Sequence, residues 1–330
     1  MRKAGETGCP ARTPADRPVT PMTSSHERTA SPGSASTGQH SAAFGTRDPK
    51  VEVVSASRLS RVGARPSLGR YLMELWRRRH FLWAEARAKV GAGSRETRLG
   101  QLWLVMTPML DGLVFYVMFG LVLRAGRGVP NFIGFLLIGV FLFGFASRCI
   151  TAGSNAINSG KNLIKAFQFP RASLPIAVVL REVLNLGIVL AALGVLLLAF
   201  PPAEIWSWRV ALVVPILGLL IAFVTGVALF FARICAAVPD VNRLISLGMR
   251  LFMWGSGVMF PLARFENQPA LLAVIRANPL FIAIDMARSV ILHGLMPGGA
   301  QWLAMSGWAV GALVLGLIFF WKAEESYGRA

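Results

Sequence analysis

Long apolar segments, nearly free of charged residues, follow one another from about residue 101 to the end of the chain. A helix needs about 20 apolar residues to cross the hydrocarbon core of a bilayer, and the segments reach or approach that length. The pattern predicts six transmembrane helices, at residues 102–123, 132–150, 174–200, 210–232, 244–260 and 302–321. The predicted fold class is therefore an all-α polytopic membrane protein.

Two shorter apolar stretches, residues 271–275 and 280–292, lie between the fifth and sixth predicted spans. Asn278 and Pro279 separate them, and Asn as a cap before Pro at the first helical position favours the start of a new helix. Neither stretch is long enough to cross a bilayer, and lipid cannot satisfy the backbone groups of a break. We expect a re-entrant helical hairpin on the outer side, sheltered by protein or water.

The first hundred residues have a different pattern. Residues 1–64 are dominated by Ser, Thr, Pro, Gly, Ala and Arg, which predicts a disordered basic cytoplasmic tail. Residues 65–100 contain an amphipathic stretch, and a helix over 71–90 in the headgroup layer is expected, with an ordinary surface helix as the alternative. Its apolar face comprises Leu72, Leu75, Trp76, Leu82, Trp83, Ala86 and Val90.

The net charge of +18 indicates an orientation. Basic residues crowd before the first span, which favours a cytoplasmic N-terminus, and an even number of spans returns the C-terminus to the same side. The loop with Lys161, Lys165 and Arg171 is then cytoplasmic as well. Nucleic-acid binding is disfavoured, because the arginines of the head are dispersed without interleaved aromatic residues. The pattern predicts a multi-pass protein of the cytoplasmic (inner) membrane.

The sequence offers little catalytic chemistry. The four histidines are scattered, so no metal site is expected, and Cys149 and Cys235 are expected to be reduced, space-filling thiols. Residues 155–162 contain a Gly-Lys pair but lack the first Gly and the closing Ser or Thr of a phosphate-binding loop. No cofactor is expected in this chain, and ATP-driven transport would need ATP and Mg²⁺ bound by another subunit.

Charged residues inside apolar segments are functional candidates, because they are costly in lipid. Arg181 and Glu182 are neighbours in sequence and are expected to have separate partners, for example Arg148 for Glu182. Asp285 and Arg288 are three residues apart and are expected to form a local ion pair, structural first and an outer gate second.

Several segments resemble the permeases of ABC-2 type polysaccharide exporters, a family with O-antigen, teichoic acid and galactan exporters. The similarity covers about residues 70–330, and its segments are LGQLWLVMTP, GSNAINSGKNLIKAFQFPRASLP, RGVPNFIGFLLIGVFLF and FFWKAEESYGRA. The last two are similar to actinobacterial galactan exporter permeases in particular. The resemblance implies a transmembrane domain over 101–330, a homodimer around a channel, a separate ABC ATPase subunit, and outward movement of a polysaccharide linked to polyprenyl diphosphate.

The resemblance also implies roles for individual residues. The loop between the second and third spans would contact the ATPase, through Asn158, Lys161, Leu163, Ile164, Lys165 and Phe167. The alternative is that this segment is a plain loop that follows the positive-inside rule. The lipid diphosphate would be contacted by four cations, Arg78, Arg79, Arg87 and Lys89. Ordinary anchoring of the helix to lipid headgroups explains the presence of these residues equally well. The channel would be lined by Asp111, Phe115, Tyr116, Phe119, Arg250 and Trp254.

Three other functions stay open. An ABC-2 exporter of a small drug or lipid would share the fold and have a narrower lumen. A membrane-embedded glycan transferase would need a clustered acid, base or metal site, which the scattered histidines and the lone Asp111 disfavour. An accessory protein without transport activity is the third.

Overall fold

A computed structural model describes residues 67–95, 103, 106, 109–110, 113–114, 117–118, 131–166, 169–199, 208–258, 268–324 and 327. Chain contacts separate a unit Met1–Arg58 from a unit Leu59–Ala330, and every described residue belongs to the second. All regular structure in the described part is helical, which confirms the all-α class. The predicted tail and most of the predicted first span lie outside these residues.

Four segments are long and apolar enough to cross a membrane: Phe132–Ser154, Ser173–Ala191, Trp208–Ala237 and Gly299–Lys322. They match the predicted second, third, fourth and sixth spans. The helices that contain them are α4 (Phe132–Ser154), α7 (Ser173–Ala199), η3 (Trp208–Leu212) with α8 (Val213–Ala237), and α12 (Gly299–Lys322). These four spans place the chain in a membrane by length and composition.

The predicted fifth span differs from the observed helix. Helix α9 (Val241–Gly255) begins earlier than residue 244 and has 15 residues, too few to cross a bilayer by itself. Ser256 caps its end and Gly257 follows with a φ of 62°, the left-handed conformation that commonly terminates helices. The prediction of a span that continues to residue 260 therefore overestimated the length of this helix.

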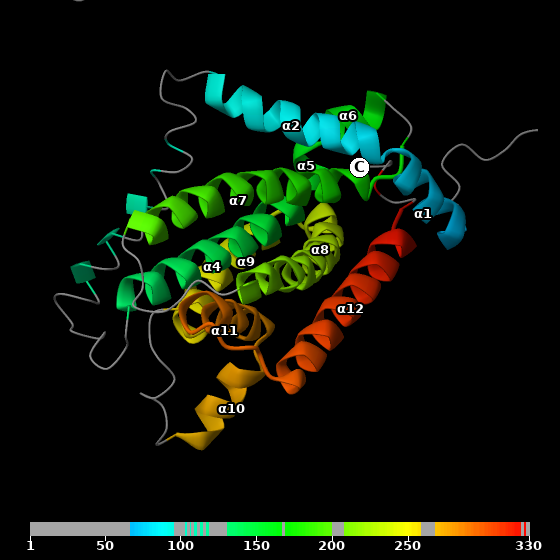
Figure 1. Cartoon of the computed structure of the whole chain (residues 1–330). Coiled ribbons are helices and arrows are strands. Elements are labelled where there is room, and N and C mark those ends of the chain that lie inside the picture. Colours follow the sequence, from blue (N-terminus) through cyan, green and yellow to red (C-terminus); the bar gives the residue numbers. More distant parts are fainter. Residues whose placement is uncertain are drawn as a thin grey trace, which may run out of the picture. The chain divides into compact units, whose positions relative to one another are not determined.

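Helix α8 lies at the centre of the described bundle and packs against α4, α7, α11 and α12 (Figure 1). The backbones of α8 and α12 are in contact where Gly226 faces Ala312 and Gly316. The approach is so close that a Cβ atom at either glycine would overlap the backbone of the other helix. Small residues at such crossings are typical of helix pairs in membranes.

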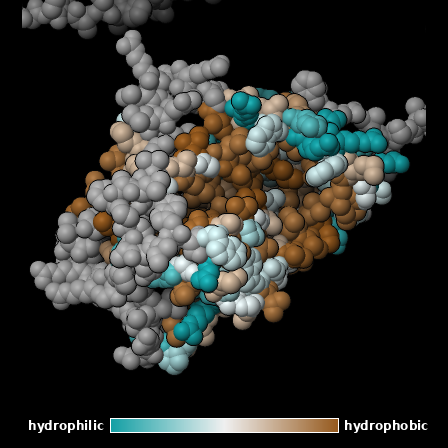
Figure 2. Space-filling model, in the orientation of Figure 1, coloured by the Kyte–Doolittle hydropathy of each residue, from teal (hydrophilic) through white to brown (hydrophobic). Residues whose placement is uncertain are grey.

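The face of the bundle seen in Figure 2 is largely apolar around α8 and α12, and hydrophilic residues gather at its two ends, toward α1 and around α10. On α12, Leu303 and Leu315 are 78% and 67% exposed. Water would make such a surface unfavourable, while lipid tails or an apolar partner surface would not.

The predicted single helix over 71–90 is two helices, α1 (Leu68–Arg77) and α2 (Arg79–Arg95), interrupted at Arg78. The interruption changes which side chains share a face. Leu82 and Ala86 are buried as expected, but Tyr71 is the buried residue of α1, while Trp76 and Trp83 are exposed. Helix α2 lies beside α7 (Figure 1).

The two short apolar stretches form α10 (Pro269–Ala277) and α11 (Pro279–Leu292). The Asn278 side-chain oxygen accepts a hydrogen bond from Leu280 N at 2.9 Å, which confirms the predicted cap. Helix α11 is buried along most of its length and packs against α4, α8 and α12.

Candidate functional site

Two short helices, α5 (Ala156–Ser159) and α6 (Lys161–Ala166), connect α4 to α7 in the segment expected to contact an ATPase. Ile157 is buried, and the Asn158 amide donates to Cys235 O at the end of α8 over 2.8 Å. Asn158 therefore attaches this segment to the bundle.

The predicted contact residues of α6 fall into two groups. Leu163 and Ile164 are half-buried against a cluster of the chain's own buried side chains, so they do not project from it. Asn162 and Lys165 are exposed and Lys161 is partly so. Phe167 lies outside the described residues. A partner at this surface would meet polar side chains first.

A buried polar junction holds the far end of this segment. The Tyr71 hydroxyl of α1 donates to Glu324 Oε2 at 2.9 Å and accepts from Ala172 N at 3.0 Å. Arg171 N donates to Glu324 Oε1 at 2.9 Å, and the Arg171 guanidinium donates to the Glu324 backbone carbonyl. Burial raises the pKa of the Glu324 carboxyl and of the Tyr71 hydroxyl. Three segments distant in sequence thus meet at one carboxylate.

A second charged group lies within α4 and α7. Arg148 Nε is 3.2 Å from Glu182 Oε2, which confirms the predicted pair. The expectation that Arg181 and Glu182 have separate partners is wrong, because Arg181 Nη2 is 3.0 Å from Glu182 Oε1. The long arginine side chain reaches around the helix, so neighbours in sequence can pair. One buried carboxylate therefore faces two arginines, which leaves a net positive charge.

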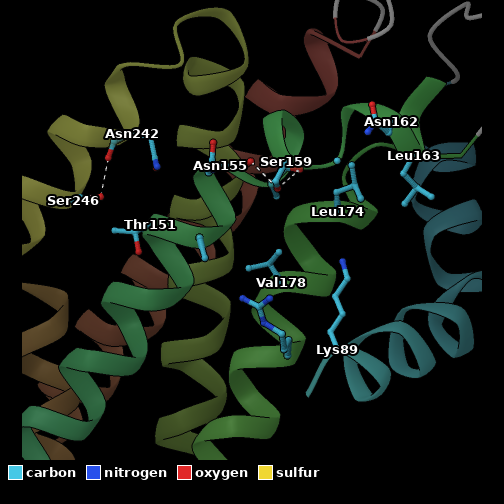
Figure 3. Close-up of a pocket in the computed structure, with 14 residues that line it drawn as sticks. Lys89, Thr151, Asn155, Ser159, Asn162, Leu163, Leu174, Val178, Asn242 and Ser246 are labelled. Atoms are coloured by element: carbon cyan, nitrogen blue, oxygen red, sulfur yellow. Dashed lines mark hydrogen bonds between the residues drawn. The ribbon is translucent and has the colours of Figure 1, made fainter. Parts of the chain in front are cut away.

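A cavity of about 880 Å³ lies between α2, α4, α5, α6, α7 and α9 (Figure 3). Its lining is made of hydroxyl, amide, small apolar and basic side chains: Lys89, Thr151, Ala152, Asn155, Ala156, Ser159, Gly160, Asn162, Leu163, Leu174, Val178, Arg181, Asn242 and Ser246. We call it the α2–α7 cavity. Ser154 helps to shape it, because its hydroxyl lies 2.8 Å from Asn242 Oδ1 and joins α4 to α9.

The α2–α7 cavity is electropositive. Lys89 and Arg181 are among its described lining residues, and none of those residues is acidic. Lys89 Nζ pairs with Glu85 at 2.9 Å, and the Lys89 side chain is 53% exposed, so solvent weakens this pair. Two cations beside several hydroxyl and amide groups suit an anionic, hydroxyl-rich ligand.

The other predicted diphosphate contacts lie elsewhere. Arg78, Arg79 and Arg87 are exposed, and none is among the described residues that line the cavity. Arg79 lies 5.1 Å from the Trp76 ring centroid, in a cation–π contact. Sequence reasoning missed Arg181 as a cavity residue, because its position in an apolar segment suggested a packing partner instead.

The predicted channel residues are partly described. Arg250 and Trp254 are exposed on α9. Asp111, Phe115, Tyr116 and Phe119 lie outside the described residues.

The predicted ion pair between Asp285 and Arg288 is wrong. Arg288, 3% exposed, donates to Phe135 O at 3.0 Å, Gly257 O at 3.0 Å and Val258 O at 2.8 Å. Asp285 instead accepts from Gln301 at 2.9 Å. The end of α9 leaves carbonyl groups that need donors, and Arg288 satisfies them.

No three His, Cys, Asp or Glu side chains gather as a metal site within the described part of the chain. The absence of a cofactor therefore stays a prediction. Cys149 and Cys235 are free and buried, as predicted.

Comparison with known proteins decides the family, because the model of the ABC-2 type transporter family matches residues 88–292. The chain belongs to the ABC-2 type transporter family. It is 23% identical over 262 residues to the O-antigen export system permease protein RfbA of Myxococcus xanthus, covering 79% of this chain and 99% of that one. It is 26% identical over 204 residues to the RfbA protein of Klebsiella pneumoniae, covering 61% and 76%.

A further relative is the polysialic acid transport protein KpsM of Escherichia coli, 23% identical over 232 residues, which cover 69% of this chain and 88% of that one. These relatives are named as permease and transport proteins, and the ATPase is a separate subunit in this family. The expectation of a transporter permease, not an enzyme, is confirmed.

Proposed function

We propose that this chain is the permease subunit of an ATP-driven exporter that moves polysaccharide linked to polyprenyl diphosphate outward across the cytoplasmic membrane. The observation that carries the proposal is the similarity to an O-antigen export permease over 99% of that relative's length. Galactan is the first candidate glycan, because the closing segment FFWKAEESYGRA resembles galactan exporter permeases.

The proposed working unit is a homodimer with six spans per subunit and cytoplasmic termini, in which the fifth crossing would need α9 together with the residues that follow it. Helices α1 and α2 would lie in the cytoplasmic headgroup layer, which the exposed Trp76 and Trp83 side chains support. Helices α10 and α11 would form the outer re-entrant hairpin, and Asp285 and Arg288 would act at an outer gate. Arg288 would do so by fixing the end of α9 against α4.

The proposed docking site for the ATPase subunit is the segment α5–α6. Lys165 and Asn162 are exposed there and suit a partner groove. Movement of α5 would reach α8 through the Asn158 bond to Cys235 O. At the other end it would reach α1 and α12 through the junction of Arg171 and Glu324.

Depletion of this protein in its native cells, followed by assay of lipid-linked glycan on each side of the membrane, tests the proposed function. Accumulation on the cytoplasmic side with synthesis intact is the expected result, and labelled galactan in that pool would identify the glycan. Unchanged sidedness would contradict polysaccharide export and favour a small drug or lipid as substrate. Loss of synthesis itself would favour a glycan transferase.

A further inference from the structure

The α2–α7 cavity joins the elements that a substrate entering from the cytoplasm would meet first. Lys89 reaches toward it from α2, and Asn162 and Leu163 enter its wall from α6 (Figure 3). In the proposed orientation the cavity is on the cytoplasmic side, beside the segment proposed to dock the ATPase. Its volume of about 880 Å³ lies in the range of small-molecule binding sites.

Arg181 is available to a ligand because of the way its charge is balanced. Its side chain is 31% exposed, while Glu182 is only 6% exposed and also pairs with Arg148. The carboxylate compensates one positive charge, so the two arginines keep one in excess. A guanidinium can bind two oxygens of a phosphate at once while its remaining donors keep an existing partner.

We infer that the α2–α7 cavity binds the diphosphate of a lipid-linked glycan, with Arg181 and Lys89 contacting the phosphate oxygens. Thr151, Asn155 and Asn242, which line the same cavity, supply hydroxyl and amide groups for the hydroxyls of the first sugar. Lys89 is the one predicted diphosphate contact among the described lining residues, and Arg181 is new. This assignment rests on the export function proposed above, and it places substrate recognition beside the ATPase docking segment.

Farnesyl diphosphate, a short polyprenyl diphosphate, serves as the probe. Its affinity for the full-length chain in lipid nanodiscs is measured by calorimetry, with inorganic diphosphate and phosphatidylglycerol as competitors. Arg181→Gln is expected to weaken probe binding by about tenfold or more, since a hydrogen bond to a charged group contributes about 1.5–3 kcal/mol. Phosphatidylglycerol is expected to compete poorly. Inorganic diphosphate is expected to compete, because it carries the group that the two cations contact.

The chain offers a matched control for each cation. Arg148→Gln removes the other cation that pairs with Glu182 but no described cavity-lining residue. Glu182 then compensates Arg181 alone, so a smaller loss of probe affinity than in Arg181→Gln is expected, of about two- to threefold. In the same way, Lys89→Gln is compared with Glu85→Gln, which breaks the same ion pair and keeps the cavity cation. If Arg181→Gln does not fold, the Lys89 and Glu85 pair decides.

Equal losses in Arg181→Gln and Arg148→Gln would overturn the inference, because the Glu182 ion pairs alone would explain them. Probe binding that survives both Arg181→Gln and Lys89→Gln would also overturn it. Equal competition by phosphatidylglycerol would indicate a general headgroup site, and failure of inorganic diphosphate to compete would mean that the diphosphate is not the group recognised; either result would overturn the inference. The depletion assay tests the export function independently. Glycan trapped on the cytoplasmic side together with a failed binding test would contradict only the assignment of the cavity. An unchanged distribution of glycan across the membrane would contradict the export function.

Discussion

Replacing Tyr71 by Phe removes one hydroxyl from the junction that joins α1, the start of α7 and the C-terminal end of α12. The ring stays buried, so the change tests the two hydrogen bonds and not the packing. Burial raises the pKa of this hydroxyl, so it keeps its proton and donates to Glu324 under all ordinary conditions.

The expected cost follows from those two bonds. A hydrogen bond to a charged acceptor contributes about 1.5–3 kcal/mol, and a buried N–H left without a partner costs about 1–3 kcal/mol. Tyr71→Phe removes the hydrogen bond to Glu324 and leaves the N–H of Ala172 without its partner. The sum is roughly 2.5–6 kcal/mol, or a melting temperature lower by roughly 5–12 °C for a chain of this length.

The assay is thermal unfolding in detergent with a dye that fluoresces on reacting with thiols. Cys149 and Cys235 are buried and free, so they react only on unfolding, and a Cys9→Ser background removes the third thiol. Tyr327→Phe is the matched control, because within the described residues its hydroxyl makes one hydrogen bond, to Phe320 O at 3.2 Å. That variant is expected to lose about 1 kcal/mol or less.

A melting temperature for Tyr71→Phe equal to that of Tyr327→Phe would refute the reasoning. The junction would then contribute no more than an ordinary hydrogen bond at the end of a helix.

Three further predictions follow from other contacts. Burial raises the pKa of Glu324 above its usual 4.5, so the protonated carboxyl favours the folded state. This contribution to stability is present below pH 4.5 and falls as the pH rises through the raised pKa. Glu324→Gln should remove this part of the pH dependence of the melting temperature. Gly316→Ala should cost roughly 1–3 kcal/mol in the same assay, because its Cβ would overlap α8, whereas Gly311→Ala, which has open space, should not destabilise. Lys165→Glu should weaken the affinity for the ATPase subunit, measured by titration, by about five- to tenfold, whereas Arg276→Glu on α10 should leave this affinity unchanged.

Each of these has a contradicting result. A pH profile shared by wild type and Glu324→Gln would assign the titration to other groups. Equal stability of the two glycine variants would mean that α8 and α12 are not in backbone contact. Equal ATPase binding by the two charge-reversal variants would remove α6 from the docking surface.

The spans were predictable where length alone decides. Apolar runs gave α4, α7, α8 and α12 to within a few residues, because lipid exposure tolerates almost no polar side chain over that distance. The same count failed at α9, where Gly257 ends the helix inside an apolar run. Hydropathy does not register a backbone conformation.

The polar contacts were less predictable. The Arg148–Glu182 pair could be anticipated, but Arg181 joined it because side-chain reach exceeds what helix spacing suggests. The bond between Tyr71 and Glu324 joins residues 253 positions apart, and no local pattern marks either one. Arg288 donates to backbone carbonyls of α4 and of the residues just after α9, which no sequence pattern displays.

The candidate site shows the same division. The segment around Leu163 was predictable as a cytoplasmic connection, but its apolar side chains face the chain's own core. The cavity beside it needs α2, α4, α7 and α9 at once, and only their packing brings Lys89 and Arg181 to one space.

Transport by purified components tests the central claim most directly. The permease and its ATPase subunit are reconstituted into proteoliposomes with a radiolabelled polyprenyl-diphosphate glycan on the outer face, and ATP is added outside. The account predicts that ATP moves the label into the lumen, where an impermeant glycosidase cannot reach it, and that omitting this chain abolishes the movement. Label that stays accessible with ATP and both subunits present would contradict it.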